Sequence, residues 1–273
     1  MPKDQKVPSS LWDEAKRAGA PPWHYSGDII AIEFWTDPEV ANAGLPRGLA
    51  EDVGADGHMF AFFGDWQFAG QNEEHLDPAR YQYRQFSILV DALYRDTPVS
   101  WCPFMCVDNY AAIERGLIQG TPVILGSIHQ TRTFAAPSPA AAPVESGTRF
   151  AASMSAHGQR MAEGQITLQQ TMRRPPDALK RPIVSRRHFS RLDSAHGGPA
   201  EIDELVMAVT ESRSLIDLWT ASAEILFPEA PGQNLHHFQP RRVGQGYRFS
   251  MSYSIRNLKV LEGLSNRGVP PER

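Results

Sequence analysis

The stretch that decides the fold of this 273-residue chain covers residues 108–129 and reads DNYAAIERGLIQGTPVILGSIH. The Asp-Asn pair at its start precedes a helical stretch, for which we predict residues 110–118. Gly120 and Pro122 end that helix, since glycine commonly follows the last helical residue and proline cannot continue a helix. The chain then becomes extended over residues 123–128. The block therefore predicts a short helix followed by a strand.

Strand signals dominate on both sides of this block. Residues 28–35 (DIIAIEFW) are rich in β-branched and aromatic side chains, which favour strands. A short helix is predicted after Thr36 as its N-cap, and another over residues 255–264, where apolar residues recur at a helical spacing. The Ala/Pro/Ser-rich residues 135–144 predict a loop. Further strands are predicted over residues 58–64, 83–93, 99–107, 148–154, 164–171, 182–189, 203–211 and 246–254.

Many short strands with turn signals, and only a few short helices, predict the fold class. We expect a mainly β fold of α+β type, with a mostly antiparallel sheet arranged as a barrel or a sandwich. A chain of this length buries a large core without the help of a metal or a disulfide.

Composition excludes several classes of protein. The net charge of −4 gives no positive field that would attract nucleic acid, and the apolar runs are far shorter than the roughly 20 residues that cross a bilayer. No secretory signal is visible, and Cys102 and Cys106 are predicted to be buried thiols, so we expect a cytoplasmic protein. No nucleotide-binding or metal-binding motif is present, so we predict no cofactor and no metal. A basic run over 173–191 either pairs with the acidic residues 201–211 or forms a rim that attracts anions.

The 108–129 block resembles the core of the acetoacetate decarboxylase family, in which an Asp-Asn pair opens a helix, an Arg-Gly follows and a Gly-x-Pro-Lys-Lys-Leu-Gly stretch carries the catalytic lysine. Weaker landmarks extend the resemblance to both sides. It implies a cone-like barrel of antiparallel strands around a pocket, assembly into a homo-oligomer and activity on small keto acids. We accordingly expect an N-terminal arm over 1–25, one acetoacetate decarboxylase-like domain over 26–265 and a C-terminal tail over 266–273.

Departures from the family pattern bear directly on the chemistry. The two positions of the Lys-Lys pair are Val123 and Ile124, and neither side chain can form an imine. Gln85 stands where the family has a carboxylate. Only five lysines are present, and none of them matches the family position: Lys3, Lys6, Lys16, Lys180 and Lys259. The sequence therefore predicts a pocket that does not use Schiff-base chemistry.

Three more residues are candidates for the site. Family members with aldol-condensing and dehydrating activity add a glutamine and a tyrosine, for which the resemblance implies Gln67 and Tyr253. The alternatives are a strand-end amide for Gln67 and a core tyrosine for Tyr253. Arg115 matches the family's Arg-Gly and would hold a substrate carboxylate through two hydrogen bonds. The alternative for Arg115 is a buried ion pair with Asp108 or Glu114.

The resulting hypothesis is an acetoacetate decarboxylase-like enzyme of lyase type. Dehydration, aldol or retro-aldol reaction, cyclisation or isomerisation of a keto-acid-like or polyketide-like substrate would suit it, without Schiff-base catalysis. Two alternatives stay open: a small-molecule binding protein that has kept the pocket without catalysis, and a decarboxylase with a relocated lysine. Tyr253, Gln67 and Gln85 are the candidate catalytic residues. The candidate substrate-binding residues are Arg115, Val123 and Ile124.

Overall fold

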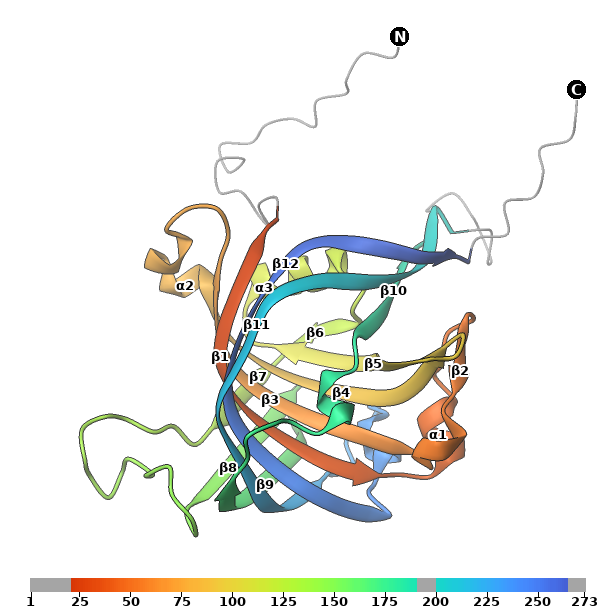
Figure 1. Cartoon of the computed structure of the whole chain (residues 1–273). Helices are drawn as coiled ribbons and strands as arrows, with labels where there is room; N and C mark the ends of the chain where they lie inside the picture. Colours follow the sequence, from red (N-terminus) through yellow and green to blue (C-terminus); the bar gives the residue numbers. More distant parts are fainter. Residues whose placement is uncertain (1–20, 191–199, 265–273) are drawn as a thin grey trace, which may run out of the picture.

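The computed structural model describes residues 21–190 and 200–264, and Figure 1 shows the path of the chain. Most of the predicted N-terminal arm and the whole predicted C-terminal tail lie outside the described residues. The first strand begins at Trp23, which lies within the segment predicted as an arm.

Strands make up most of the described chain, which confirms the predicted mainly β fold with a few short helices. None of the helices in this part of the chain has the length and apolarity needed to cross a bilayer. The strands are β1 (Trp23–Trp35), β2 (Leu49–Glu51), β3 (His58–Ala69), β4 (Gln82–Tyr94), β5 (Thr97–Val107), β6 (Val123–Leu125), β7 (Ser127–Gln130), β8 (Arg149–Ala156), β9 (Gln159–Thr171), β10 (Ile183–Phe189), β11 (Ile202–Leu226) and β12 (Arg242–Gly263). The helices are α1 (Pro38–Asn42), α2 (Pro78–Tyr81) and α3 (Tyr110–Ile118), with 3₁₀ turns η1 (Val53–Ala55), η2 (Glu74–Leu76), η3 (Asp177–Lys180) and η4 (Leu235–Phe238).

The strand pairings close into a circuit. Strand β10 pairs with β5, the order then runs through β4, β3, β1, β12 and β11, and β11 pairs with β10 again. The β10–β5 pairing is parallel, whereas the other pairings of the circuit are antiparallel. From β11 the sheet also continues through β9 and β8 to β7. Figure 1 shows the result as a strongly curved sheet.

The second half of strand β1 is buried on both of its faces. Ile30, Ile32 and Phe34 pack in a cluster that extends to β8 and β9, and we call it the outer cluster. Ile29 and Ala31 pack with residues inside the circuit, which we call the inner cluster. Burial on both faces explains why residues 29–32 of β1 form a continuous apolar run, whereas buried and exposed residues alternate over residues 23–26.

The predicted helix over residues 255–264 is wrong, because β12 continues as a strand to Gly263. The register between β11 and β12 shifts twice within this segment, and each shift adds one residue on the β12 side. Such a bulge changes the spacing between residues on one face from two to three, which imitates the spacing of a helix. Ile255 and Leu258 accordingly both line the interior.

The start of α1 also differs from the prediction. Its N-cap is Asp37, whose side chain accepts a hydrogen bond from the backbone N–H of Glu39 (2.9 Å). The predicted cap, Thr36, is buried, and its hydroxyl donates to the carbonyl oxygen of Gln239 (2.9 Å). Tertiary contact therefore engages the Thr36 side chain, and the helix begins one residue later.

Antiparallel pairing of β10 with β11 places the basic run against the acidic segment. Arg186 makes two hydrogen bonds to Asp203 (2.7 and 2.8 Å), and Arg187 lies 2.5 Å from Glu204. These contacts favour the pairing alternative for the basic run over a free anion-attracting rim.

Both cysteines are free and buried, and burial raises the pKa of each thiol to about 12. They belong to different clusters, Cys102 to the inner one and Cys106 to the outer one. A register shift between β4 and β5 inserts one extra residue on β5 between them, so two positions that are four apart face opposite sides.

Candidate functional site

A cavity of about 210 Å³ lies inside the strand circuit. Its walls come from the strands of the circuit, from α3 and from η3, which precedes β10. The volume suits a small metabolite, since pockets for drug-sized ligands measure about 300–1,000 Å³. Three of the predicted site residues line this cavity together: Arg115, Gln85 and Tyr253.

Helix α3 carries Arg115 into the cavity. The helix begins after Asn109, whose side-chain oxygen accepts hydrogen bonds from the N–H groups of Ala111 (2.8 Å) and Ala112 (3.3 Å). It ends before Gly120, whose φ of 75° is the left-handed conformation that glycine commonly adopts after a helix. Arg115 lies in the last turn and is only 2% exposed. The caps therefore fix the length of the helix that places this side chain.

Nη1 and Nη2 of the Arg115 guanidinium make no hydrogen bond of regular geometry among the described residues, although the hydroxyls of Tyr25 and Tyr83 lie near enough to interact with it. Its Cζ lies 3.9 Å from the ring centroid of Phe68 and 5.5 Å from that of Tyr83. Asp108, one of the predicted ion-pair partners, accepts a hydrogen bond from the backbone N–H of Arg84 (2.6 Å). Burial of a cation with unused donors is costly unless an anion completes it. The guanidinium is therefore prepared to receive an anionic group.

The lining of the cavity is positive. Among the described residues, its ionisable side chains other than tyrosine are three arginines, and no Asp, Glu, His or Lys lines it. Arg181 is neutralised by Asp52 (2.9 Å) and Asp91 (3.3 Å). Arg115 and Arg213 have no carboxylate within 4.0 Å in the part of the chain that the structure describes.

Tyrosine hydroxyls form the second group of polar atoms in the cavity. Tyr25 and Tyr253 stack with ring centroids 4.9 Å apart, and Tyr83 lies beside Arg115. The Oη atom of Tyr25 lacks a hydrogen-bond partner among the described residues. Burial raises the pKa of all three tyrosines, although the nearby Arg115 partly offsets this. The hydroxyls therefore stay protonated near neutral pH and are available as hydrogen-bond donors.

Two amides complete the polar lining. Gln85 lies on β4, where Tyr83, Gln85 and Ser87 alternate toward the cavity, and its Nε2 donates to Oγ of Ser87 (3.4 Å). Gln119 lies just after α3, and its Nε2 donates to the carbonyl oxygen of Arg115 (3.2 Å). Each amide keeps a carbonyl oxygen and a second N–H for a ligand.

The structure corrects the placement of three predicted site residues. Gln67 is exposed on the outer face of β3, because its neighbours Trp66 and Phe68 take the inward positions, and it accepts a hydrogen bond from Gln82 (3.3 Å). Val123 pairs with Met105 and packs on the inner cluster without lining the cavity. Ile124 packs against the outer cluster, as alternation along β6 requires.

The lysines lie elsewhere, as far as the structure describes them. Lys180 Nζ is 2.6 Å from Asp177, and Lys259 is an exposed residue of β12. Neither lines the cavity, although Ala178 and Leu179 just before Lys180 do. Lys3, Lys6 and Lys16 lie outside the described residues.

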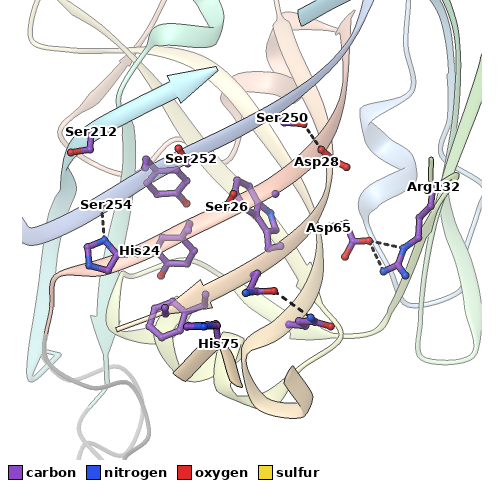
Figure 2. A pocket seen from close by; sticks show the side chains of 18 residues that line it. His24, Ser26, Asp28, Asp65, His75, Arg132, Ser212, Ser250, Ser252 and Ser254 are labelled. Carbon is purple, nitrogen blue, oxygen red and sulfur yellow. Dashed lines mark hydrogen bonds and ion pairs between the residues drawn. The ribbon is translucent and has the colours of Figure 1, made fainter. Parts of the chain in front are cut away.

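A second depression lies on the outer face of β1, β3 and β12, and Figure 2 shows it. Alternation places hydroxyls along it, among them the half-buried Ser250 and Ser252 and the buried Ser254. Its charged and polar groups partner one another, since Arg132 binds Asp65 (2.6 Å) and His24 Nδ1 lies 2.7 Å from Ser254 Oγ. The interior cavity, whose Arg115 guanidinium has no such partner, is therefore the stronger candidate.

Sequence reasoning missed most residues that line the cavity, among them the polar residues Tyr25, Tyr83, Gln119 and Arg213. Tyr83 carried a usable signal, because it lies two residues before Gln85 on a predicted strand and so shares its face. Tyr25 fell in the segment predicted as an arm. The inward position of Arg213 depends on a bulge, which periodicity does not reveal.

Comparison with known proteins adds the family context. The profile described as acetoacetate decarboxylase (ADC) matches residues 6–264. The solved enduracididine biosynthesis enzyme MppR, complexed with the condensation product of pyruvate and imidazole 4-carboxaldehyde, is 28% identical, with a TM-score of 0.86 over 94% of this chain and 96% of that one. An acetoacetate decarboxylase-like enzyme from Sphingomonas wittichii RW1 is 21% identical, with a TM-score of 0.79 over 96% and 98% of the two chains, and shares the fold. A comparison with curated proteins gave no match.

Proposed function

The chain belongs to the acetoacetate decarboxylase family, and from this premise we propose that it is a lyase-type enzyme acting on a small keto acid without an imine intermediate. The cavity would bind the substrate through charge and hydrogen bonds. An MppR structure complexed with pyruvate, 29% identical to this chain, supports a keto acid as the ligand class.

Arg115 carries this proposal. Its buried guanidinium offers two unused nitrogens, Nη1 and Nη2, in a cavity whose described lining holds no carboxylate. A carboxylate would complete it through a pair of charge-assisted hydrogen bonds. The aromatic rings of Phe68 and Tyr83 on either side would keep water away from that pair.

The tyrosines and amides would act on the keto group. Dehydration and aldol-type reactions pass through an enolate, whose oxygen needs hydrogen-bond donors. Tyr253 and Tyr25 supply protonated hydroxyls, and Gln85 supplies an amide N–H. Each positioned donor of this kind contributes about 10²–10³-fold to a rate.

An imine route has no support among the described residues. The family resemblance matches Val123 and Ile124 to the lysine pair, and the described lysines, Lys180 and Lys259, do not line the cavity. A decarboxylase with a relocated lysine would therefore need one of the three lysines in residues 1–20 to enter the cavity.

A second candidate function is binding without catalysis. It is favoured by one observation: no His, Asp, Glu or Lys is among the described residues lining the cavity, so no side chain of ordinary basicity there removes a proton. Such a protein would sense or carry the keto acid.

Calorimetric titration with pyruvate and 2-oxobutyrate tests the role of Arg115. Arg115→Gln is expected to weaken binding by about tenfold or more, the scale of losing a hydrogen bond to a charged group. Arg160→Gln is the matched control, because Arg160 pairs with Glu163 (3.1 Å) on β9 and does not line the cavity. Equal affinities of the wild type and Arg115→Gln would refute the proposal.

Exchange of the C3 protons of pyruvate for deuterium, followed by proton NMR, separates the two candidate functions. An enzyme that stabilises an enolate accelerates this exchange, and Tyr253→Phe slows it. Tight binding without accelerated exchange would leave the binding protein as the function.

A further inference from the structure

A second arginine of the cavity, Arg213, has no role in the function proposed above. It is an exposed residue of β11 that lines the same cavity, and its Nη2 donates to the carbonyl oxygen of Leu179 (2.6 Å). No carboxylate of the described chain lies within 4.0 Å of it. Partial burial lowers its pKa somewhat, yet a guanidinium remains charged at neutral pH. Its remaining N–H groups are therefore available to a ligand.

A bulge in β11 aims Arg213 inward. Thr210 lines the cavity, so simple alternation would send Ser212 inward and Arg213 outward. The register with β12 shifts between Glu211 and Ser214, and Ser212 adopts a left-handed φ of 52°. As a result Ser212 lies with the hydroxyls of the outer depression in Figure 2, while the exposed Arg213 lines the cavity on the other face of β11. A left-handed backbone is unfavourable for serine, and such strain is concentrated at functional sites.

Arg213 also differs from the third arginine of the cavity. Arg181 is held by Asp52 and Asp91, so its charge is already balanced. Arg115 and Arg213 are not balanced in this way, and Tyr253 lies within the electrostatic influence of both. The cavity lining therefore holds two guanidinium groups without a carboxylate partner, Arg115 and Arg213, and the phenol of Tyr253 interacts electrostatically with both.

We propose that Arg213 is a second anion-binding residue and that the substrate is a small oxo acid with a second acidic group, namely a 2-oxo dicarboxylate. The proposal rests on the proposed function, in which Arg115 holds the first carboxylate. Arg213 would hold the second one, and the keto group would lie between them near Tyr253.

The test compares matched ligands by calorimetric titration of the full-length protein. Each 2-oxo dicarboxylate, from oxaloacetate through 2-oxoglutarate to 2-oxoadipate, is paired with the 2-oxo monoacid in which a methyl group replaces the distal carboxylate. The wild type is expected to prefer the dicarboxylate in at least one pair by about tenfold, the scale of one added charge-assisted contact. Arg213→Gln is expected to abolish this preference and to leave the affinity for the monoacid unchanged.

The variants distinguish failure of this inference from failure of the proposed function. The inference about Arg213 is overturned if the wild type prefers no dicarboxylate, or if Arg213→Gln keeps the preference. The proposed function still stands in either case, provided that Arg115→Gln weakens the binding of both ligands. If Arg115→Gln changes neither affinity, the proposed function fails. Arg160→Gln, which removes the same charge far from the cavity lining, is expected to behave as the wild type.

Variants of Ser212 test the positioning role of the bulge without touching Arg213. Ser212→Gly keeps the left-handed conformation and is expected to retain the preference for the dicarboxylate. Ser212→Val disfavours that conformation and is expected to reduce the preference, with the monoacid affinity preserved. An unchanged preference in a folded Ser212→Val variant would show that the bulge does not position Arg213.

Discussion

His58 and Arg115 are both buried cations, and they differ in how their charge is met. His58 is 6% exposed, and its two ring nitrogens lie 2.7 Å from Asp91 and 3.1 Å from Glu33. Asp91 in turn contacts Arg181 of the cavity wall. The charge of His58 is balanced within the protein, so it belongs to the framework that holds Arg181. In the proposed function, the charge of Arg115 is met by the ligand.

The pairing of His58 makes stability depend on pH. Burial alone lowers its pKa, but the hydrogen bonds to Asp91 and Glu33 and their charges outweigh this and raise the pKa to about 9. A group whose pKa is higher in the folded state stabilises it fully below the unfolded pKa of about 6.5, and that stabilisation is lost as the pH rises through 9. We expect the free energy of unfolding to fall by on the order of 3 kcal/mol from this group between pH 6 and pH 9.5. Urea denaturation of the wild type and of His58→Gln at several pH values measures this change in the free energy of unfolding. Equal pH dependence of the two proteins would show that His58 is not its source.

At the scale of elements, α3 places the central residue of the site, and its end depends on Gly120. A Cβ added to Gly120 would lie 2.7 Å from the backbone nitrogen of Arg187, in a left-handed conformation with φ of 75°. Gly232 has a similar φ of 74° but nothing within 4 Å of an added Cβ. The two glycines therefore separate the cost of conformation from the cost of the clash.

Gly120→Ala is expected to lower the free energy of unfolding more than Gly232→Ala does. The conformational cost is about 1 kcal/mol or more in both, and the clash adds about 1–3 kcal/mol at Gly120 alone. Chemical denaturation of both variants gives the difference. Equal decreases in the free energy of unfolding would show that the backbone at the end of α3 shifts to accommodate the added methyl group at no extra cost.

The individual elements also show which parts of the fold the sequence predicts. Residues 108–129 predicted the helix, its end and the following strand, because caps and glycine act locally. The family resemblance, and not the strand pattern, pointed to Gln85, Arg115 and Tyr253, and all three line the cavity. Bulges are not predicted from the pattern of a single strand. They gave residues 255–264 the apolar spacing of a helix, and they turn Arg213 toward the cavity where simple alternation predicts the outer face. Bulges depend on the partner strand, so one strand's sequence does not disclose them.

At the scale of the whole molecule, the strand circuit encloses the cavity and β10 closes it. Closure rests on one parallel contact with β5, at Ile183 and Val184, and on the longer antiparallel pairing with β11. Sequence patterns indicated a barrel or sandwich without showing which strands meet, since non-local pairing is set by tertiary packing.

Assembly into a homo-oligomer remains a prediction from the family resemblance. Light scattering coupled to size-exclusion chromatography is expected to give a mass that is a whole multiple, greater than one, of the chain mass. A monomer at every concentration would contradict it, without affecting the cavity, whose described lining comes from a single chain.

The central claim is that this family cavity handles a keto acid through charge and hydrogen bonds and forms no imine. Borohydride treatment of the wild type with a panel of small keto acids, followed by intact-mass analysis, tests it most directly. Val123→Lys serves as a comparison variant, because the family resemblance aligns residue 123 with the catalytic lysine and its side chain packs on the inner cluster. We predict no adduct on the wild type. A reduced adduct that maps to one of its five lysines would contradict the account.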